Sequence, residues 1–397
     1  MIKSISIKNF KSIVDLTVNL GQFNVFIGEN GCGKSNILEG ISLGAAASVH
    51  KLDREFFANR GIRYTDPFFM YSAFNNNENS YINIDISFSE SSINNKNFKL
   101  RYNTNLKPAQ WEDLSFNEMI EKLKETISKI ELTTTIDKLP SLKIENSDIQ
   151  KLMIQFNENL KKINLNTNKF EIAISSFNNS LKNYNIFSLE ESILRKFDAD
   201  NAIHPLGRNG EGLFAYLKEI SQKENGVEIL KEIKDNLCVL DWFDDLEIPK
   251  DQLSNEFSLQ VKDKYINETL HFFDQRSTNE GFLYLLFYLT LFISDDTPSF
   301  FAIDNLEASF NPKLCREITK RLILLAKKHN KQVIATTHSP AILDGLDINN
   351  NDERLFVIRR NIDGYTKANR IEYKTENNLA LSEAWLKGYI GGLPENF

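Results

Sequence analysis

One octapeptide near the N-terminus limits the possible folds of this chain more than any other feature. Residues Gly28–Ser35 read Gly-Glu-Asn-Gly-Cys-Gly-Lys-Ser, a complete match to the pattern G-x-x-x-x-G-K-S. A largely apolar run, Gln22–Ile27, precedes the octapeptide, and a helical pattern follows from Asn36. This order of strand, glycine-rich loop and helix is the context in which such a loop cradles phosphate groups. The sequence therefore predicts an α/β fold with a phosphate-binding loop.

The predicted loop offers several kinds of ligand. Its glycines let backbone N–H groups approach the phosphates, and the following helix adds the positive partial charge of its N-terminus. Lys34 is expected to reach the β- and γ-phosphates, and the Ser35 hydroxyl to bind Mg²⁺. Cys32 occupies a variable position, where we expect a tolerated small residue, with a redox-sensitive thiol as the alternative.

A second motif, Phe300–Asp304, is an apolar strand that ends in a carboxylate. P-loop proteins use such an aspartate to hold Mg²⁺ through its water shell. The next residue is Asn305, whose neutral amide can orient water but cannot take its proton. Three alternatives stay open: Glu307 supplies the missing carboxylate, Asn305 directs slow hydrolysis, or the site does not hydrolyse nucleotide.

A third motif, Thr336–Pro340, follows the buried-strand pattern Gln332–Ala335 and contains His338. A single histidine is more often structural than functional. At the end of a sheet strand beside a nucleotide site, however, it can sense the γ-phosphate. Because two nucleotide motifs accompany it, we expect this role for His338.

The spacing of apolar side chains divides the chain into three parts. Residues 1–111 contain the phosphate loop and an alternating β-meander, and residues 204–397 contain apolar strands that alternate with helices. Between them, residues 112–203 carry apolar side chains at helical spacing, interrupted at Pro140 and at Asn164–Asn168. We therefore predict one head with a mixed, largely parallel sheet, assembled from the two outer parts, and a helical insertion between them.

Composition limits the compartment and the partners. Lys and Arg total 47 and Asp and Glu 54, a net charge of −7, so any DNA contact must be local. The three cysteines form no Cys-x-x-Cys pair, which indicates neither a disulfide framework nor a zinc module and favours the cytoplasm. The longest apolar run, Phe282–Ile293, is shorter than the about 20 residues of a spanning helix, so no membrane partner is expected.

Taken in order, the motifs resemble those of the RecF, SMC and OLD-like ATPases, the ABC-type ATP-binding heads. The resemblance rests on Ile7–Ile13 with the phosphate loop, on Asp304–Pro312 and on Thr337–Ser339, and it covers roughly residues 1–50 and 204–360. It implies an ABC-type P-loop ATPase head that binds ATP and Mg²⁺. It also implies a homodimer, or a higher homo-oligomer, in which each ATP lies between two subunits.

The resemblance also assigns site residues. Asn279-Glu280-Gly281-Phe282 looks like a degenerate ABC signature, with Asn279 where a Ser is usual and Ser277 as the alternative hydroxyl. The ABC-type heads place a Glu where this chain has Asn305, so hydrolysis is expected to be weak. The implied catalytic residues are Lys34, Asp304, Asn305, Glu307 and His338. The implied metal ligands are Ser35 and Asp304, and the implied nucleotide ligands are Lys11, Asn30, Gly31, Cys32, Gly33, Lys34, Ser35, Asn36, Asn279 and Gly281.

The short insertion makes the chain most similar to the stand-alone ATPase subunits of bacterial antiphage systems such as Septu and PARIS. That resemblance implies a separately encoded nuclease or toxin as the regulated partner. Small basic clusters, at Lys327–Lys331 and at Arg359–Arg370, leave sequence-independent DNA binding open. The alternatives are a RecF-like ATPase of DNA repair or recombination, and a non-hydrolysing scaffold in which ATP joins subunits.

The C-terminal run Leu381–Pro394 contains a short amphipathic pattern followed by Gly-Gly-Leu-Pro. Helical spacing predicts that Trp385 and Tyr389 share one face. The run is expected to pack onto the head, and a partner-binding tail is the alternative.

Overall fold

The computed structural model describes residues 1–74, 81–89, 95–116, 118, 179–196, 205–248, 259–267, 273–274, 276–372 and 379–393. Its larger sheet has the strand order β14-β13-β3-β12-β11-β7. The bounds are β3 (Phe23–Ile27), β7 (Ile186–Phe187), β11 (Phe300–Ile303), β12 (Gln332–Thr336), β13 (Glu353–Arg360) and β14 (Thr366–Ile371). All neighbouring pairs are parallel except β13 with β14, which confirms the predicted mixed, largely parallel sheet.

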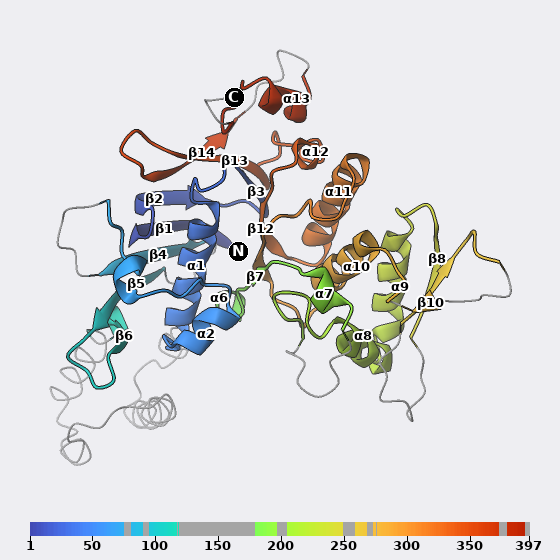
Figure 1. The fold of residues 1–397 in the computed structure, drawn as a ribbon, viewed down its shortest axis with the longest axis horizontal. Coiled ribbons are helices and arrows are strands. Elements are labelled where there is room, and N and C mark those ends of the chain that lie inside the picture. The colour runs from blue at the N-terminus through green and yellow to red at the C-terminus, as the bar shows by residue number, and fades with distance from the viewer. Residues whose placement is uncertain are drawn as a thin grey trace, which may run out of the picture.

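Helices cover both faces of this sheet, which explains why its central strands β3, β11 and β12 are buried throughout (Figure 1). On one face, Phe26 and Ile334 pack in a common core with α1 (Lys34–Ser48). On the other face, Val25 and Val333 pack with α10 (Glu280–Ile293) and α11 (Pro312–Lys328). Helix α10 is apolar on all sides because it lies between α9 (Gly226–Leu237), α11 and the sheet. In the described part of the chain, no helix is both long and apolar enough to span a membrane.

A second sheet, antiparallel throughout, packs against α1 and has the order β2-β1-β4-β5-β6. Its strands are β1 (Ile2–Phe10), β2 (Ile13–Asn19), β4 (Ile82–Phe88), β5 (Lys96–Asn103) and β6 (Gln110–Asp113). Two glycines of α1 allow the close approach: a Cβ at Gly40 would lie 2.8 Å from Cδ1 of Ile7, and one at Gly44 would lie 3.0 Å from Cγ2 of Ile84. Helix α1 is thereby held between the two sheets, with its N-terminus at the phosphate loop.

The remaining elements are smaller. Helices α8 (Leu213–Gln222) and α9 (Gly226–Leu237) pack with α10, beside a three-stranded sheet of β8 (Phe243–Glu247), β9 (Gln260–Asp263) and β10 (Phe273–Asp274). The short helices are α2 (Arg54–Asn59), η1 (Pro67–Met70), α6 (Asn179–Lys182), α7 (Glu191–Leu194), α12 (Pro340–Leu343) and α13 (Leu381–Leu386).

Most of the predicted insertion, including the breaks at Pro140 and Asn164–Asn168, lies outside the described residues. The described residues at its C-terminal end join the head. Strand β7 is the edge strand beside β11, and the ring of Tyr184 lies 4.8 Å, between centroids, from that of Phe300. Residues near 185 therefore complete the larger sheet.

Candidate functional site

The three motifs meet at one edge of the larger sheet. Strands β3, β12 and β11 are parallel neighbours, so the phosphate loop, the Thr337–Ser339 turn and Asp304 all follow the carboxyl ends of adjacent strands. Backbone hydrogen bonds tie these turns together: Thr337 N–H donates to Phe26 O at 3.1 Å, and Leu306 N–H to Thr336 O at 3.0 Å. We call Lys34, Asp304, Glu307 and His338 the strand-end cluster.

The phosphate loop takes a backbone path that only glycine permits at two of its positions. Gly28 has φ 147°, and a Cβ there would lie 2.0 Å from Ile358 O. Gly33, the residue before α1, has φ 108°, and a Cβ there would lie 2.1 Å from Thr366 Oγ1. The first and last glycines of the motif are thus required by close neighbours and by positive φ.

Lys34 spans its own loop. Its Nζ donates to Gly28 O at 2.8 Å and to Glu29 O at 3.0 Å. Burial lowers the pKa of the ammonium, whereas the nearby Asp304 and Glu307 act in the opposite direction. Because charged acceptors bind an ammonium more strongly than carbonyls do, phosphate oxygens would displace the loop carbonyls as its partners.

Asp304 is oriented by a residue to which sequence analysis assigned no role. Thr336, fully buried at the end of β12, donates its hydroxyl to Asp304 Oδ1. The same hydroxyl accepts a hydrogen bond from Asn305 N–H at 3.0 Å. The only feature of the sequence that could have indicated this role of Thr336 is its hydroxyl, two positions before His338. Asn305 itself is exposed and has φ 58°.

Glu307 lies inside the strand-end cluster. Its Oε1 accepts a hydrogen bond from His338 N–H at 2.8 Å, and its Oε2 is buried with no hydrogen-bond partner in the described structure. Buried polar atoms without a protein partner are rare and are explained by bound water, an ion or ligand, strain or a catalytic role. Of the two candidates for positioning water, the structure thus places the carboxylate of Glu307, rather than the amide of Asn305, among the cluster.

His338 is held through its backbone to Glu307. Burial lowers the pKa of its imidazole, the Lys34 ammonium lowers it further, and the carboxylates of Glu307 and Asp304 partly offset both effects. The ring is therefore neutral at pH 7 and has one N–H to donate to an acceptor such as a phosphate oxygen.

The proposed metal ligands suit Mg²⁺. Ser35 and Asp304 are oxygen donors, and Mg²⁺ is usually bound by one or two carboxylates together with phosphate oxygens and water. In the residues that the structure describes, no group of three or more His, Cys, Asp or Glu side chains could hold a metal ion. A Mg²⁺ ion held by Ser35 and Asp304 would take its remaining ligands from phosphate oxygens and water.

Two predicted nucleotide ligands belong to networks beside the loop. Lys11 forms an ion pair with the buried Glu39 of α1, and Arg63 Nε contacts the other oxygen of Glu39 at 2.5 Å. Asn36 donates to Ser12 Oγ at 2.7 Å. The structure therefore places Lys11 as a partner of Glu39, a pairing that no local sequence pattern indicates.

Thr366 of β14 connects this network to the phosphate loop. Its Oγ1 lies 2.6 Å from Ser12 Oγ and donates to Cys32 O at 2.9 Å. Cys32 is buried, and burial raises the pKa of its thiol, so the unreactive thiol is favoured.

The signature-like residues lie elsewhere on the head. Asn279 caps α10: its Oδ1 accepts a hydrogen bond from Phe282 N–H at 2.8 Å. A Cβ at Gly281 would lie 3.0 Å from Ser309 O, in the turn after β11. Both line a separate cavity of about 550 Å³, to which no residue of Gly28–Ser35 contributes. Within one subunit, the structure does not bring them to the strand-end cluster.

Two predictions about the surface are wrong. Lys331 belongs to no basic surface cluster, because it is buried and donates to Ser294 O at 2.7 Å and Thr297 O at 3.1 Å at the end of α10. Trp385 and Tyr389 do not share a helix face, because α13 ends at Leu386. Trp385 is 4% exposed and packs on the head, whereas Tyr389 is 67% exposed.

Known proteins are similar to this chain in family and in fold. A family model described as "AAA domain, putative AbiEii toxin, Type IV TA system" matches residues 23–344. No curated protein matches the sequence.

Several solved structures are similar to this chain. The SMC head bound to the C-terminal winged-helix domain of ScpA has a TM-score of 0.54 and 14% identity, over 95% of this chain and 99% of that chain. The SMC head domain from Thermotoga maritima has a TM-score of 0.48 and 14% identity, over 94% and 99%. The Pyrococcus furiosus SMC head bound to the C-terminal domain of ScpA has a TM-score of 0.48 and 14% identity, over 97% and 98%. The first likeness shows the fold of an ABC-type head.

Proposed function

The chain belongs to this AAA family, AAA_21, and from that premise we propose that it is an ATPase that binds MgATP, hydrolyses it slowly and regulates a separate effector protein in bacterial antiphage defence. The observation that carries the ATPase proposal is the strand-end cluster, which gathers an ammonium, two carboxylates and an imidazole beside the phosphate loop. The defence role rests on the resemblance to stand-alone ATPase subunits that work with a nuclease or toxin.

Each residue of the cluster has a role in this proposal. Phosphate oxygens replace Gly28 O and Glu29 O as acceptors for Lys34, and Ser35 and Asp304 hold Mg²⁺, which neutralises charge on the phosphates when bound. Glu307 is fixed through one oxygen by His338 N–H, which leaves its other oxygen to accept a proton from water.

The proposal includes a second subunit. The N-terminus of α10, where Asn279 and Gly281 lie, carries Glu280 in its first turn and borders the cavity of about 550 Å³, outside the strand-end cluster. A second copy would bring this helix end to the nucleotide held by the first. ATP would then join the subunits, and hydrolysis would release them.

A non-hydrolysing scaffold is the second candidate, and Asn305, in place of the Glu found in ABC-type heads, favours it. Steady-state MgATP turnover and ATP binding, compared between the chain and Lys34→Ala, distinguish the two. Turnover that Lys34→Ala abolishes supports the ATPase. Tight binding with no turnover above the Lys34→Ala background refutes hydrolysis and leaves the scaffold. Turnover that duplex DNA strongly stimulates favours a RecF-like repair ATPase over the defence role.

A further inference from the structure

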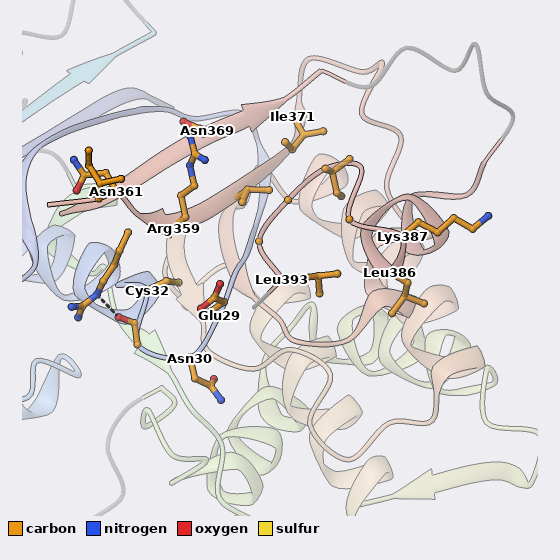
Figure 2. Close-up of a pocket in the computed structure, with 18 residues that line it drawn as sticks. Glu29, Asn30, Cys32, Arg359, Asn361, Asn369, Ile371, Leu386, Lys387 and Leu393 are labelled. Atoms are coloured by element: carbon orange, nitrogen blue, oxygen red, sulfur yellow. Dashed lines mark hydrogen bonds between the residues drawn. The ribbon is translucent and has the colours of Figure 1, made fainter. Parts of the chain in front are cut away.

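The C-terminal segment lies against the outer side of the phosphate loop and leaves a cleft of about 1030 Å³ (Figure 2). One wall of the cleft is the loop turn Glu29–Cys32. The second wall is the end of the β13–β14 hairpin, and the third is the segment Leu386–Leu393. None of the four residues of the strand-end cluster lines this cleft. The cleft shares Asn30, Gly31 and Cys32 with the expected nucleotide site but extends away from the strand-end cluster, to the β13–β14 hairpin and the C-terminal segment.

Direct contacts join the three walls. A Cβ at Gly392 would lie 3.0 Å from Cγ1 of Val357 and 3.5 Å from Cα of Gly28, so the C-terminal segment touches both other walls. Arg360 Nε donates to Gly31 O at 3.0 Å, the hydrogen bond drawn in Figure 2. The cleft is thus formed within a single chain.

The rim of the cleft is basic. Arg359, Arg360 and Lys387 are exposed, and no ion pair joins any of them to a carboxylate among the described residues. Arg359 lies 3.3 Å from the side-chain amide of Asn369, a neutral partner on the neighbouring strand. Glu29 is the one carboxylate among the lining residues. In a chain of net charge −7, this is a local site for an anionic group.

The same cleft is also apolar. Among the lining residues, Val357 is buried, and Ile390 and Leu393 are partly buried. At the rim, Ile362 is fully exposed and Leu386 is 63% exposed. Large apolar side chains exposed beside unpaired cations are typical of protein interfaces.

We propose that this cleft docks an extended segment of a partner protein that carries Asp or Glu next to large apolar side chains. Carboxylates of that segment pair with Arg359, Arg360 and Lys387, and its apolar side chains cover Val357 and Leu393. The chemistry favours a peptide over a nucleic acid, because the described residues that line the cleft include no aromatic side chain on which a base could stack.

Docking in this cleft does not depend on ATP turnover. A second consequence does rest on the proposed ATP binding: the turn Glu29–Cys32 belongs to both sites, so MgATP should change the affinity of the docked segment. A partner bound here would thereby sense whether the phosphate loop is occupied.

The test is a selection of random dodecapeptides displayed on phage, with the full chain as bait and counter-selection on the double variant Arg359→Glu/Lys387→Glu. The best synthetic peptide is then titrated by fluorescence anisotropy. We expect an acidic and apolar consensus, and a loss of affinity of at least tenfold in Arg359→Glu. A peptide with Lys in place of its acidic residues should regain affinity for Arg359→Glu. Lys327→Glu, the same charge change at an exposed position at the end of α11, is the matched control and should bind normally.

Three results would overturn the docking proposal, and a fourth would overturn only its coupling to ATP. No enriched peptide, or peptides equally sensitive to Lys327→Glu and Arg359→Glu, would reject the docking site. A single-stranded DNA oligonucleotide that binds through Arg359 when no peptide does would assign the cleft to nucleic acid. Peptide affinity that is the same with and without MgATP, in a chain shown to bind ATP, would reject the coupling alone. If Lys34→Ala abolishes ATP binding but not peptide binding, the two sites are separate as proposed.

Discussion

The carboxylate of Glu307 is anchored by the backbone N–H of His338, 2.8 Å from Oε1, while its Oε2 is buried without a hydrogen-bond partner among the described residues. The turns after β11 and β12 thus hold the Glu307 carboxylate through Oε1, and Oε2 makes no hydrogen bond to the described residues. Asn305, two positions earlier, is exposed. We therefore propose that Glu307, rather than Asn305, positions the attacking water.

Replacing Glu307 tests this assignment. Glu307→Gln keeps the size of the side chain but cannot take a proton, so we expect kcat for MgATP to fall at least about 100-fold. The Kd for ATP should change by less than about threefold, because Lys34 and the loop supply the binding. Asn305→Ala is the control and should retain most of the turnover. A collapse of kcat in Asn305→Ala, with Glu307→Gln active, would assign the role to the amide instead.

Thr336 is expected to control Mg²⁺ affinity through Asp304. Thr336→Val has a similar shape but leaves Asn305 N–H without its acceptor and Asp304 without its hydroxyl donor. We expect a free energy of unfolding lower by about 1–3 kcal/mol and a higher Mg²⁺ concentration at half-maximal turnover. Urea unfolding and Mg²⁺ titrations check both. Thr336→Ser restores the hydroxyl, so its Mg²⁺ concentration at half-maximal turnover should return to that of the wild type. If Thr336→Ser needs as much Mg²⁺ as Thr336→Val, the hydroxyl does not orient Asp304.

Two glycines of the phosphate loop should respond differently to alanine. Gly31→Ala meets no atom within 4 Å, so its cost is that of φ 77°, about 1–2 kcal/mol. Gly33→Ala adds a collision with Thr366 and should reduce ATP affinity at least tenfold more than Gly31→Ala. Isothermal titration with ATP compares the two variants. Equal affinities would mean that the contact with Thr366 does not determine the shape of the loop.

Lys331 predicts a pH dependence of stability. Burial lowers its pKa from 10.5 to about 8, so between those pH values the unfolded chain holds a proton that the folded chain has lost. The contribution of Lys331 to the free energy of unfolding is therefore lowest below pH 8 and rises as the pH approaches 10.5. Lys331→Met lacks the titration. The free energy of unfolding of the wild type, relative to that variant, should increase by about 2 kcal/mol between pH 8 and pH 10.

Urea unfolding of both proteins at the two pH values measures this difference. The subtraction cancels the other groups that titrate in this range, because the two chains share them. A difference that stays constant, or that falls with pH, would show that the ammonium is not buried as the structure describes.

The parts of the site that depend on contiguous residues were predicted from the sequence. The loop Gly28–Ser35, Asp304 after β11 and His338 after β12 each follow an apolar strand, and parallel strands bring their carboxyl ends to one edge. The mixed sheet followed from the same alternation of strands and helices. Local pattern was sufficient because each motif is fixed by its own strand and turn.

The partners of individual side chains were decided by tertiary structure. Lys11 pairs with Glu39, Lys331 is buried under the end of α10, and Thr366 donates to Cys32, 334 positions away in the chain. The C-terminal segment, through Gly392, lies against the phosphate loop. Such contacts join residues distant in sequence, and no periodicity records which of many polar or apolar surfaces will meet. The sequence by itself determined the strand-end motifs and their shared edge, whereas only packing determined which charges are paired, which are buried and which remain on the rim of the cleft.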